Sequence, residues 1–509
     1  MTHIFLYGPP GTGKTTIGKI LARNLKLPFI DLDLVVESNA GISIPQIMKQ
    51  QGESVFRDLE TAALKQIALS PNPSPSGGGE SVIALGGGAL LRDENREFVE
   101  ALGKVILLMA SVDTLYQRLN DSPNKRSLLA GGLREKLKTL LEKRSEHYAA
   151  FPLHIHVDKN SAEQNAHKVQ VALGRHHLFA MGEYDVIVGQ IANLPDCDII
   201  VTDENIAPHH LAKVKQAIGR NVPSVILPAG EEHKNLETVS LLWKSFLDNR
   251  LDRKSTVIAL GGGVIGDLSG FAASTYMRGI NWISIPTTLL SMVDASLGGK
   301  TGFDLPEGKN LIGSFHPPKL VLADPSLLLT LTERELGSGM AEVVKHGIVS
   351  DPELFSLCSN GLDWVKNNLD EIVKRAMAVK IKIIEADPYE KGFRAALNLG
   401  HTVGHAVELV SKFNLRHGEA LAIGMVVEAK YAEQMGIAPK GLADKIAETT
   451  SALRLPIHIP EEMPRAEIIR AMRVDKKRHA KSIRFALPVA IGKVELVDVS
   501  DLESVISYQ

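Results

Sequence analysis

A glycine-rich run near the start of this 509-residue chain constrains its folding more than any other sequence feature. The run Gly8-Pro-Pro-Gly-Thr-Gly-Lys-Thr15 fits the pattern G-x-x-x-x-G-K-[ST] and lies between the apolar segment Ile4–Tyr7 and the helix-like segment Thr16–Leu25. In this strand–loop–helix context, glycines let backbone N–H groups face a phosphate, and the helix N-terminus adds a favourable dipole. We expect Lys14 to reach the β- and γ-phosphates of a nucleotide and Thr15 to bind Mg²⁺. The residues expected to contact the nucleotide are Gly11, Thr12, Gly13, Lys14, Thr15 and Thr16.

Strand-like and helix-like segments alternate along residues 1–160. This alternation predicts an α/β domain, a parallel sheet with helices on both faces. A Pro/Ser/Gly-rich stretch, Ser70–Gly79, is expected to be a surface loop. The expected strands are Ile4–Tyr7, Pro28–Leu32, Val82–Leu85 and Val105–Met109, and the expected helices are Thr16–Leu25, Ile44–Ile67, Val112–Leu119 and Leu133–Tyr148.

A second, larger region follows a polar, helix-like segment that we interpret as a linker at residues 161–183. The α/β alternation resumes over residues 184–325, whereas residues 326–509 consist mainly of long helical segments. A groove between these two parts is a natural place for a ligand site. The expected strands are Tyr184–Val188, Ile199–Thr202, Val225–Leu227, Thr256–Leu260, Trp282–Pro286 and Leu320–Leu322, and the expected helices are Leu336–Val349, Leu369–Glu385, Asn398–Val410 and Gly418–Met435.

Composition excludes several classes of protein. With 44% hydrophobic and 23% charged residues, the chain is typical of soluble globular proteins with more than one domain. A net charge of −2 and 5% aromatic residues do not favour a nucleic-acid partner. We see no signal peptide and no membrane-spanning stretch, so we expect a cytoplasmic protein with no membrane partner. Its two cysteines, Cys197 and Cys358, are expected to be free, buried thiols.

Further motifs narrow the substrate of the phosphate loop, which also occurs in adenylate kinases, gluconate kinases and many ATPases. Asp31 and Asp33 lie two residues apart at the end of an expected strand, where alternation places both side chains on the same side. One carboxylate suits Mg²⁺, and the other suits a substrate hydroxyl. Farther along lie Gly52-Glu-Ser-Val-Phe-Arg57 and Ala84-Leu-Gly-Gly-Gly88.

In the order and spacing of these four motifs, residues 1–160 resemble shikimate kinase. The resemblance implies ATP-dependent phosphorylation of shikimate to shikimate 3-phosphate, with Mg²⁺ near Asp31 and Thr15. It also implies that Asp33 binds shikimate hydroxyls and accepts a proton, and that Lys14 takes part in catalysis. A different small-molecule kinase remains the alternative for this part of the chain.

The same resemblance assigns the rest of the shikimate site. Arg57 and Arg144 would hold the shikimate carboxylate, a task suited to a bidentate guanidinium, and Gly87 would pack against the ring. Arg126 would steady the transferred phosphoryl group from a lid. The chain departs from the family in that lid, with Arg126-Ser-Leu128 in place of Arg-Pro-Leu, and in the inserted stretch Ser70–Gly79.

Three expected strand ends in the second region carry glycines or hydroxyl groups. Ala259–Asp267 is a glycine-rich turn that follows one strand and opens a helix. Pro228–Lys234 follows another strand, and Thr287 and Thr288 end a third. Because glycines permit close approach of the backbone to a pyrophosphate, the three strand ends predict one dinucleotide bound across the sheet.

Histidines in the helical region predict a metal site. His401 and His405 have i, i+4 spacing on one helix face, and His417 and Glu342 lie in other helical segments. One glutamate and two histidines leave a zinc coordination position open for substrate. Spacing alone favours His401 and His405 as the two histidine ligands.

Residues 184–500 resemble 3-dehydroquinate synthase. The resemblance implies Glu342, His401 and His417 as ligands of Zn²⁺ or Co²⁺, and it makes His405 a substrate-binding residue instead. It also implies a homodimer through this region. The segments that carry the resemblance are Gly261–Asp267, Pro286–Leu290, Val293–Thr301, Gly308–Asn310, Gly339–Lys345 and Asn398–His405.

The implied substrate is 3-deoxy-D-arabino-heptulosonate 7-phosphate, and the implied cofactor is NAD. NAD would oxidise a substrate hydroxyl, phosphate would leave, and NADH would return the hydride before an intramolecular aldol step closes the ring, with the metal as Lewis acid. The implied cofactor-binding residues are Asp203, Gly230, Glu231, Lys234, Gly262, Gly263, Val264, Ile265, Gly266, Asp267, Thr287, Thr288, Lys300, Lys309 and Thr330. The implied substrate-binding and catalytic residues are Asp294, Lys300, Asn310, Lys345, Lys380, Arg394, Asn398 and His405.

Departures and alternatives remain for this region. Asp387-Pro-Tyr-Glu390 replaces the usual Asp-Glu-x-Glu, and the motif at Asp475-Lys476-Lys477 does not tell which lysine contacts phosphate. Another sugar-phosphate cyclase and an iron-type alcohol dehydrogenase share the pattern, although the basic pair Lys380 and Arg394 favours a substrate with a carboxylate. A regulatory nucleotide-binding module is the non-enzymatic alternative.

Overall fold

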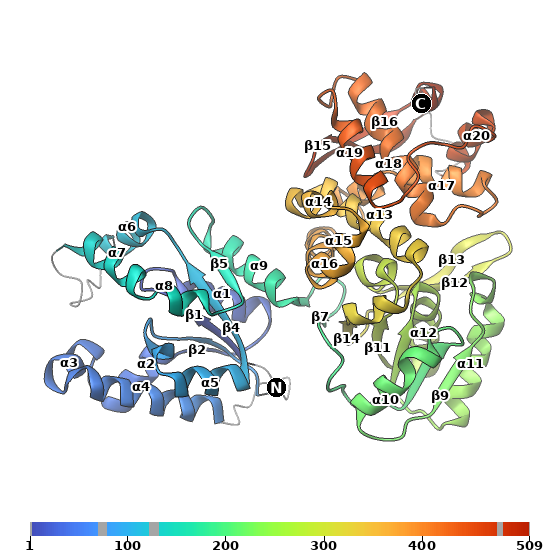
Figure 1. Cartoon of the computed structure of the whole chain (residues 1–509). Helices are drawn as coiled ribbons and strands as arrows, with labels where there is room; N and C mark the ends of the chain where they lie inside the picture. The colour runs from blue at the N-terminus through green and yellow to red at the C-terminus, as the bar shows by residue number, and fades with distance from the viewer. Residues whose placement is uncertain (1–2, 70–78, 122–131, 476–481, 508–509) are drawn as a thin grey trace. The chain divides into compact units, whose positions relative to one another are not determined.

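The computed structural model of this protein describes residues 3–69, 79–121, 132–475 and 482–507. The chain divides into two compact units, Met1–His177 and Leu178–Gln509 (Figure 1). Several sequence predictions fall outside the described residues. They concern residues 70–78 of the Pro/Ser/Gly-rich stretch, Arg126 with its lid, and Lys476 and Lys477.

The first unit contains a five-stranded parallel sheet in the order β2-β3-β1-β4-β5. Alternate side chains of β1 enter two different cores, Ile4 and Leu6 on one face and Phe5 and Tyr7 on the other. Helices cover both faces, which is why β1 is apolar throughout. The strands are β1 His3–Tyr7, β2 Phe29–Asp31, β3 Val82–Ala84, β4 Gly103–Met109 and β5 His154–His156. The helices are α1 Lys14–Asn24, α2 Leu32–Ala40, α3 Ile44–Gln50, α4 Gly52–Leu69, η1 Ala89–Leu91, α5 Asp93–Leu102, α6 Val112–Asn120, α7 Leu133–Lys143, α8 Ser145–Ala149 and α9 Ala162–Leu173.

Two features of this unit differ from the sequence prediction. Strand β2 ends at Asp31 and α2 begins at once, so Asp33 lies in a helical turn and the argument from strand alternation was wrong. The segment interpreted as a linker contains α9, which begins with a capping box at Ser161 and buries Ala166 and Val169 in the core beside α1. Residues 161–183 are therefore structured, because the apolar face of α9 has a partner to pack against.

A seven-stranded sheet in the order β6-β7-β14-β11-β10-β8-β9, parallel from β7 to β9, opens the second unit, and β6 starts three residues before Leu178. An antiparallel hairpin, β12–β13, which the sequence patterns did not predict, lies in the chain between β11 and β14. The strands are β6 Arg175–Leu178, β7 Tyr184–Val188, β8 Ile199–Asp203, β9 Ser224–Leu227, β10 Thr256–Gly261, β11 Asn281–Pro286, β12 Lys300–Leu305, β13 Gly308–Phe315 and β14 Leu320–Ala323. The helices are η3 Ala207–Leu211, α10 Ala212–Ile218, η4 Glu231–His233, α11 Leu236–Asp248, α12 Gly263–Thr275, η5 Tyr276–Arg278, η6 Ser291–Ala295 and η7 Pro325–Thr330.

The rest of the second unit is mainly helical, as predicted (Figure 1). Helix α13 is buried from Leu336 to Val349 and starts with a capping box between Thr332 and Glu335. Helices α17 and α18 pack closely, since a Cβ at Gly424 would lie 2.0 Å from the carbonyl oxygen of Gly400. The elements are α13 Glu333–Ser350, α14 Pro352–Cys358, α15 Leu362–Asn367, α16 Leu369–Ala386, η8 Phe393–Asn398, α17 His401–Val410, α18 His417–Gln434, α19 Leu442–Ala452, α20 Arg465–Asp475, β15 Ile483–Ala490, β16 Lys493–Val499 and α21 Leu502–Ile506.

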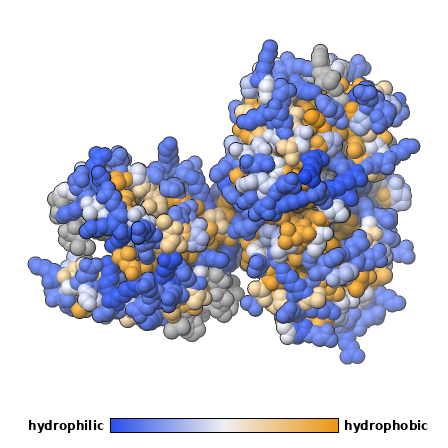
Figure 2. Space-filling model, in the orientation of Figure 1, coloured by the Kyte–Doolittle hydropathy of each residue, from blue (hydrophilic) through white to orange (hydrophobic). Residues whose placement is uncertain are grey.

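The exposed surface and the two cysteines are as the composition leads us to expect. Hydrophilic residues cover most of the face that Figure 2 shows, with hydrophobic residues in small groups. Among the described residues, no helix is both long and apolar enough to cross a membrane. Cys197 and Cys358 are free and buried, which confirms the prediction for both.

Candidate active sites

The phosphate loop connects β1 to α1, as the sequence predicts. Gly8, Gly11 and Gly13 have φ angles of 138°, 88° and 87°, in a region that L side chains rarely adopt. The turn folds Lys14 back over the loop, where its Nζ donates to the carbonyl oxygens of Gly8 at 2.8 Å and Pro9 at 3.1 Å. A positive charge at the mouth of a glycine-rich loop fits a phosphate group.

Two residues predicted to share a Mg²⁺ ion contact each other in the structure. The Thr15 hydroxyl, in the first turn of α1, donates to Asp31 Oδ2 at 2.7 Å. The other oxygen of Asp31 accepts the Asp33 N–H at 3.1 Å and caps α2. A hydroxyl and a carboxylate at this spacing are the oxygen ligands that Mg²⁺ prefers beside a bound phosphate.

Arg57, Asp33 and the glycine turn after β3 surround one position. The Arg57 guanidinium lies against Gly88, where a Cβ would be 2.6 Å from Nη2. A Cβ at Gly86 would be 3.0 Å from Asp33 Oδ1. Across this turn, Arg144 donates to the carbonyl oxygen of Gly87 at 2.5 Å. The side chains implied to bind the carboxylate and the hydroxyl groups of the substrate therefore lie around one position.

Glu60 is a site residue that the sequence reasoning missed. Its side chain is 1% exposed and accepts from Arg57 Nη1 at 2.7 Å, while Glu53 holds Nη2 at 3.1 Å. Burial raises the pKa of Glu60, and the positive charge of Arg57 opposes the shift. The available signal was the i, i+3 spacing of Arg57 and Glu60 on one helix face.

The carboxyl ends of four adjacent strands carry most of the residues implied for the dinucleotide. Open α/β sheets bind ligands outside these strand ends. The strand order is β11-β10-β8-β9. Thr330 lies apart from this row, in η7, and hydrogen-bonds with His210 at 2.9 Å. Along the four strands, the residues at or just after the strand ends are Thr287 and Thr288, then Gly262–Asp267, then Asp203, then Gly230 and Glu231.

Lys234 links the strand ends to the β12–β13 hairpin. Its Nζ lies 2.7 Å from Asp267 Oδ2 and donates to Asn310 Oδ1 at 2.6 Å. Asp304 accepts the N–H of Asn310 at 2.7 Å, which fixes that residue at a positive φ of 53°. Burial raises the pKa of Asp267 to about 6, although Lys234 opposes the shift. This network places Asn310, which is implied to bind the substrate, beside Lys234 and Asp267, which are implied to bind the cofactor.

Glu342, His401 and His417 come from three different helices and meet at one point. Glu342 Oε1 lies 3.5 Å from the Nε2 atom of each histidine. The Nδ1 atoms face away from Glu342, that of His401 toward the Leu399 carbonyl oxygen at 3.3 Å and that of His417 toward Glu408 at 3.2 Å. Because each Nδ1 has an acceptor for its hydrogen, Nε2 is the nitrogen of each neutral ring that would bind a metal ion. One carboxylate and two imidazoles fit Zn²⁺ or Co²⁺.

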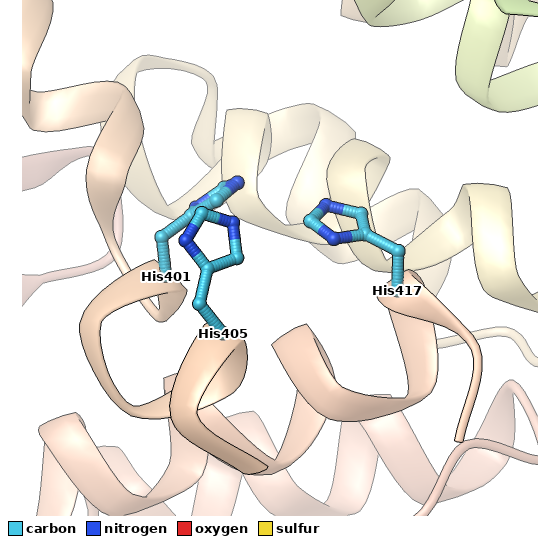
Figure 3. Close-up of side chains that lie close together, drawn as sticks. All are labelled: His401, His405 and His417. Carbon is cyan, nitrogen blue, oxygen red and sulfur yellow. The ribbon is translucent and has the colours of Figure 1, made fainter. Parts of the chain in front are cut away.

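The third histidine, His405, borders this group. Its exposed ring lies 5.0 Å from the ring of His401 and 5.7 Å from that of His417 (Figure 3). Ligand atoms of the three histidines lie within 4.8 Å of one another. The contact with Glu342 therefore favours His401 and His417 as ligands, and it leaves His405 facing the open side.

Electrostatics at the centre follow from the buried Lys345. Burial raises the pKa of Glu342, but the ion pair with Lys345 and the two histidines outweigh this effect and hold the pKa well below its usual value. Burial and Lys345 lower the pKa of His401 to about 4. Burial also lowers the pKa of His417, but Glu342 and Glu408 raise it to about 9. An ionised carboxylate and neutral imidazoles are the forms that bind a metal ion, so an ion bound here would displace the second proton of His417.

The other basic residues implied for the substrate lie in the same region and have protein partners. Lys380, from the buried face of α16, donates to Asp294 Oδ1 at 2.5 Å. The exposed Lys300, at the start of β12, pairs with Glu390 at 3.0 Å. Arg394 is 4% exposed and donates to the Pro388 carbonyl oxygen at 2.5 Å. Asn398 ends η8, three residues before His401.

The unusual loop before Arg394 is held by its first residue. The carboxylate of Asp387 accepts the N–H groups of Lys391 at 2.9 Å, Gly392 at 2.8 Å and Arg394 at 3.0 Å. The turn places Glu390 at a positive φ of 58° beside Lys300. The Pro-Tyr departure from the family pattern is thus compatible with an ordered approach to Arg394.

Comparisons with known proteins find relatives of both units of the chain. The shikimate kinase family profile matches residues 10–173, and the N-terminal and C-terminal profiles of 3-dehydroquinate synthase match residues 224–338 and 339–478. A 3-dehydroquinate synthase of Nostoc punctiforme is 42% identical over 355 residues, which are 67% of this chain and 95% of the relative. Another from a Synechococcus strain is 44% identical over 310 residues, 59% of this chain and 84% of the relative.

Solved structures of related cyclases share the architecture of the second unit. A 2-deoxy-scyllo-inosose synthase complexed with carbaglucose-6-phosphate, NAD⁺ and Co²⁺ is 27% identical, with a TM-score of 0.58 over 64% of this chain and 96% of that one. A 2-epi-5-epi-valiolone synthase from Streptomyces hygroscopicus, with NAD⁺ and Zn²⁺ bound, is 28% identical, with a TM-score of 0.58 over 64% of this chain and 95% of that one. The chain therefore belongs to the 3-dehydroquinate synthase family through its second unit and carries a shikimate kinase domain in its first, as a bifunctional enzyme of the shikimate pathway.

Proposed function

We propose that the first unit transfers the γ-phosphoryl group of ATP to shikimate, giving shikimate 3-phosphate and ADP. The contact between Thr15 and Asp31 is the observation that carries this proposal, since it joins the phosphate loop to a second Mg²⁺ ligand. Asp33, in the first turn of α2, accepts the hydrogen bond of the attacking hydroxyl and then its proton. Lys14 and Arg126 neutralise charge on the transferred group.

In the same proposal, two arginines recognise the carboxylate of shikimate. Arg57 presents its guanidinium beside the turn at Gly86–Gly88, and Arg144 reaches the same turn from the end of α7. Glu60 and Glu53 hold the Arg57 fork before substrate arrives, which reduces the loss of side-chain freedom on binding. Gly87 leaves room for the ring.

The test of the kinase is shikimate-dependent ADP formation by the full-length chain with ATP and Mg²⁺. We expect turnover that requires shikimate and falls strongly in the variant Arg57→Met. The control is Arg92→Met, because Arg92 forms a surface ion pair with Asp58 on the neighbouring helix. ADP formation that does not depend on shikimate would contradict the proposal and favour another acceptor.

We further propose that the second unit converts 3-deoxy-D-arabino-heptulosonate 7-phosphate to 3-dehydroquinate and phosphate with NAD and Zn²⁺ or Co²⁺. The convergence of Glu342, His401 and His417 carries this proposal. When bound, the metal ion would polarise the hydroxyl that is oxidised, and NAD would supply the hydride chemistry. The relatives at 42% and 44% identity are synthases of this type, whereas the other cyclases match at 27% and 28%.

The protein's own groups account for binding in this proposal. Arg394 meets the substrate carboxylate, and Lys300 exchanges Glu390 for an anionic oxygen of the substrate. Lys345 and Lys380 keep Glu342 and Asp294 ionised in a buried setting, so that both can act as acceptors for substrate hydroxyls or the metal ion. His405, on the open side of the histidine group, and Asn398 orient the substrate. The dinucleotide follows the strand ends, with Lys309 and Lys234 on its nicotinamide side.

The variant Glu342→Gln tests the metal proposal. We expect bound zinc and synthase activity to be lost together, because a neutral amide is a poor ligand and leaves Lys345 unpaired. Kinase activity of the same sample reports the amount of chain whose first unit is folded, and the unfolding temperature of the second unit reports whether that unit is folded. Undiminished zinc content in Glu342→Gln would contradict the ligand assignment.

Substrate choice separates the synthase from other sugar-phosphate cyclases. We expect turnover of the carboxylate-bearing heptulosonate phosphate, loss of that turnover in Arg394→Met, and none with sugar phosphates that lack a carboxylate. The reverse preference would favour the alternative. We also propose a homodimer through the second unit, as in the resemblance, which light scattering on the full-length chain tests.

A further inference from the structure

The inference concerns Glu408, a carboxylate that neither sequence motif nor proposed mechanism uses. Glu408 lies on α17 one turn after His405, with its side chain 13% exposed. Its Oε2 atom lies 3.2 Å from His417 Nδ1. Glu342 lies 3.5 Å from the opposite nitrogen of the same ring, so His417 sits between two carboxylates.

The two contacts determine which nitrogen of His417 carries the proton. A neutral imidazole has one N–H donor and one acceptor nitrogen, and an ionised carboxylate only accepts. In the neutral ring that a metal ion binds, the contact with Glu408 therefore places the hydrogen on Nδ1 and leaves Nε2, on the side of Glu342, as the ligand nitrogen. Such a carboxylate–histidine pair fixes the ring and increases its basicity toward a metal ion.

His401 has the same arrangement with a different acceptor. Its Nδ1 faces the backbone carbonyl oxygen of Leu399 at 3.3 Å. A backbone acceptor is neutral and cannot be removed by substitution, whereas Glu408 is charged and can be. His417 is therefore the one of these two ligands whose orientation depends on a side chain.

The second oxygen of Glu408 faces the β12–β13 hairpin. Oε1 lies 3.7 Å from Lys309 Nζ, which is also 3.8 Å from Glu231 and 4.6 Å from the centre of the Phe413 ring. Lys309 is 47% exposed, so these ion pairs are weak. They still connect the carboxylate at the metal centre to a residue implied for the cofactor.

We propose that Glu408 is a positioning residue of the metal centre, which holds His417 in the tautomer and orientation that bind the ion. The proposal rests on the metal site of the proposed function. It predicts an effect on metal binding itself, separate from any effect on catalysis. Loss of such an outer carboxylate typically costs about 10- to 100-fold in metal affinity.

The experiment measures zinc affinity by competition with a chromophoric chelator in the full-length chain. We expect Glu408→Ala to bind zinc about 10- to 100-fold more weakly. Glu408→Gln should lose less, because its amide oxygen still accepts from Nδ1–H. The Co²⁺-substituted protein supplies a second readout, since its visible absorption reports ligand geometry and should change in Glu408→Ala.

Glu419→Gln is the matched control. Glu419 is 12% exposed and lies two residues from His417, but its carboxylate binds Arg334 at 2.6 Å and the Arg416 N–H at 2.9 Å. We expect wild-type zinc affinity in this variant, and unchanged kinase activity in all of them.

Wild-type zinc affinity and an unchanged Co²⁺ spectrum in both Glu408 variants would overturn the role of Glu408 while leaving the metal site intact. Failure of the wild-type chain to bind zinc or Co²⁺ would instead overturn the metal site and the inference with it.

Discussion

Replacing Gly424 with alanine tests whether the packing of α17 on α18 sets the geometry of the metal centre. The new Cβ would lie 2.0 Å from the Gly400 carbonyl oxygen and 2.8 Å from the Gly404 nitrogen. Ordinary contact begins at 3.4 Å, so the shorter distance is 1.4 Å too small, and both neighbours are backbone atoms that cannot rotate away. The two helices must therefore separate locally.

This separation acts directly on the ligands. Gly400 precedes His401, and His417 begins α18, so moving the helices apart separates the two imidazoles. Metal–ligand distances tolerate only about 0.2 Å of change. Overpacking of this kind costs about 1–3 kcal/mol. If metal binding must restore the close packing, the same free energy weakens zinc binding by about 5- to 150-fold.

The assay is zinc affinity by chelator competition, together with thermal unfolding of the metal-free protein. Gly337→Ala in α13 is the control, because its Cβ has a single neighbour within 4 Å, the Leu453 carbonyl oxygen at 3.6 Å. Alanine within a helix is more stable than glycine by roughly 0.5–1 kcal/mol, so this control should bind zinc normally and unfold no earlier. Wild-type affinity and unfolding temperature in Gly424→Ala would refute the reasoning.

Three further predictions concern both units. Asp33→Asn should abolish shikimate-dependent ADP formation while ATP titration shows nearly unchanged binding; a variant with near-normal turnover would argue against the role of Asp33. Burial raises the pKa of Cys197 and of Cys358 to about 12, so at pH 8 both are thiols and should react with Ellman's reagent only after unfolding; prompt labelling of the native chain would contradict their burial. Removing zinc with a chelator should lower the unfolding temperature of the second unit only. The second unit loses about 2.7 kcal/mol of stability relative to the protein with zinc at 100 times Kd. Calorimetry that shows both unfolding transitions moving equally would be inconsistent with one metal site.

Local patterns were enough to predict the phosphate loop and the alternation of strands and helices. The glycines of Gly8–Thr15 permit the positive φ angles that the phosphate loop needs, and β1 is apolar on both faces because both faces are covered. In the same way, the i, i+4 spacing of His401 and His405 correctly placed their rings together, 5.0 Å apart. These properties depend on residues within one or two turns of one another.

Other properties depend on where a chain segment meets a distant one. Asp33 was assigned to a strand, but α2 begins as soon as Asp31 can cap it. The segment 161–183 has no linker character once α9 packs beside α1. Glu60 lies one helical turn after Arg57 on α4. Only the folded structure shows that both side chains border the glycine turn after β3.

The metal centre makes the division clearest. The sequence by itself determined that histidines would lie on one face of α17, since helical geometry follows from spacing. Which histidines face Glu342 was decided by the tertiary structure, because Glu342 lies on α13 and is equally distant from His401 and His417. The contact of Glu408 with His417 also became visible only there, because it comes from α17 packing against α18, and no spacing along one helix encodes that packing.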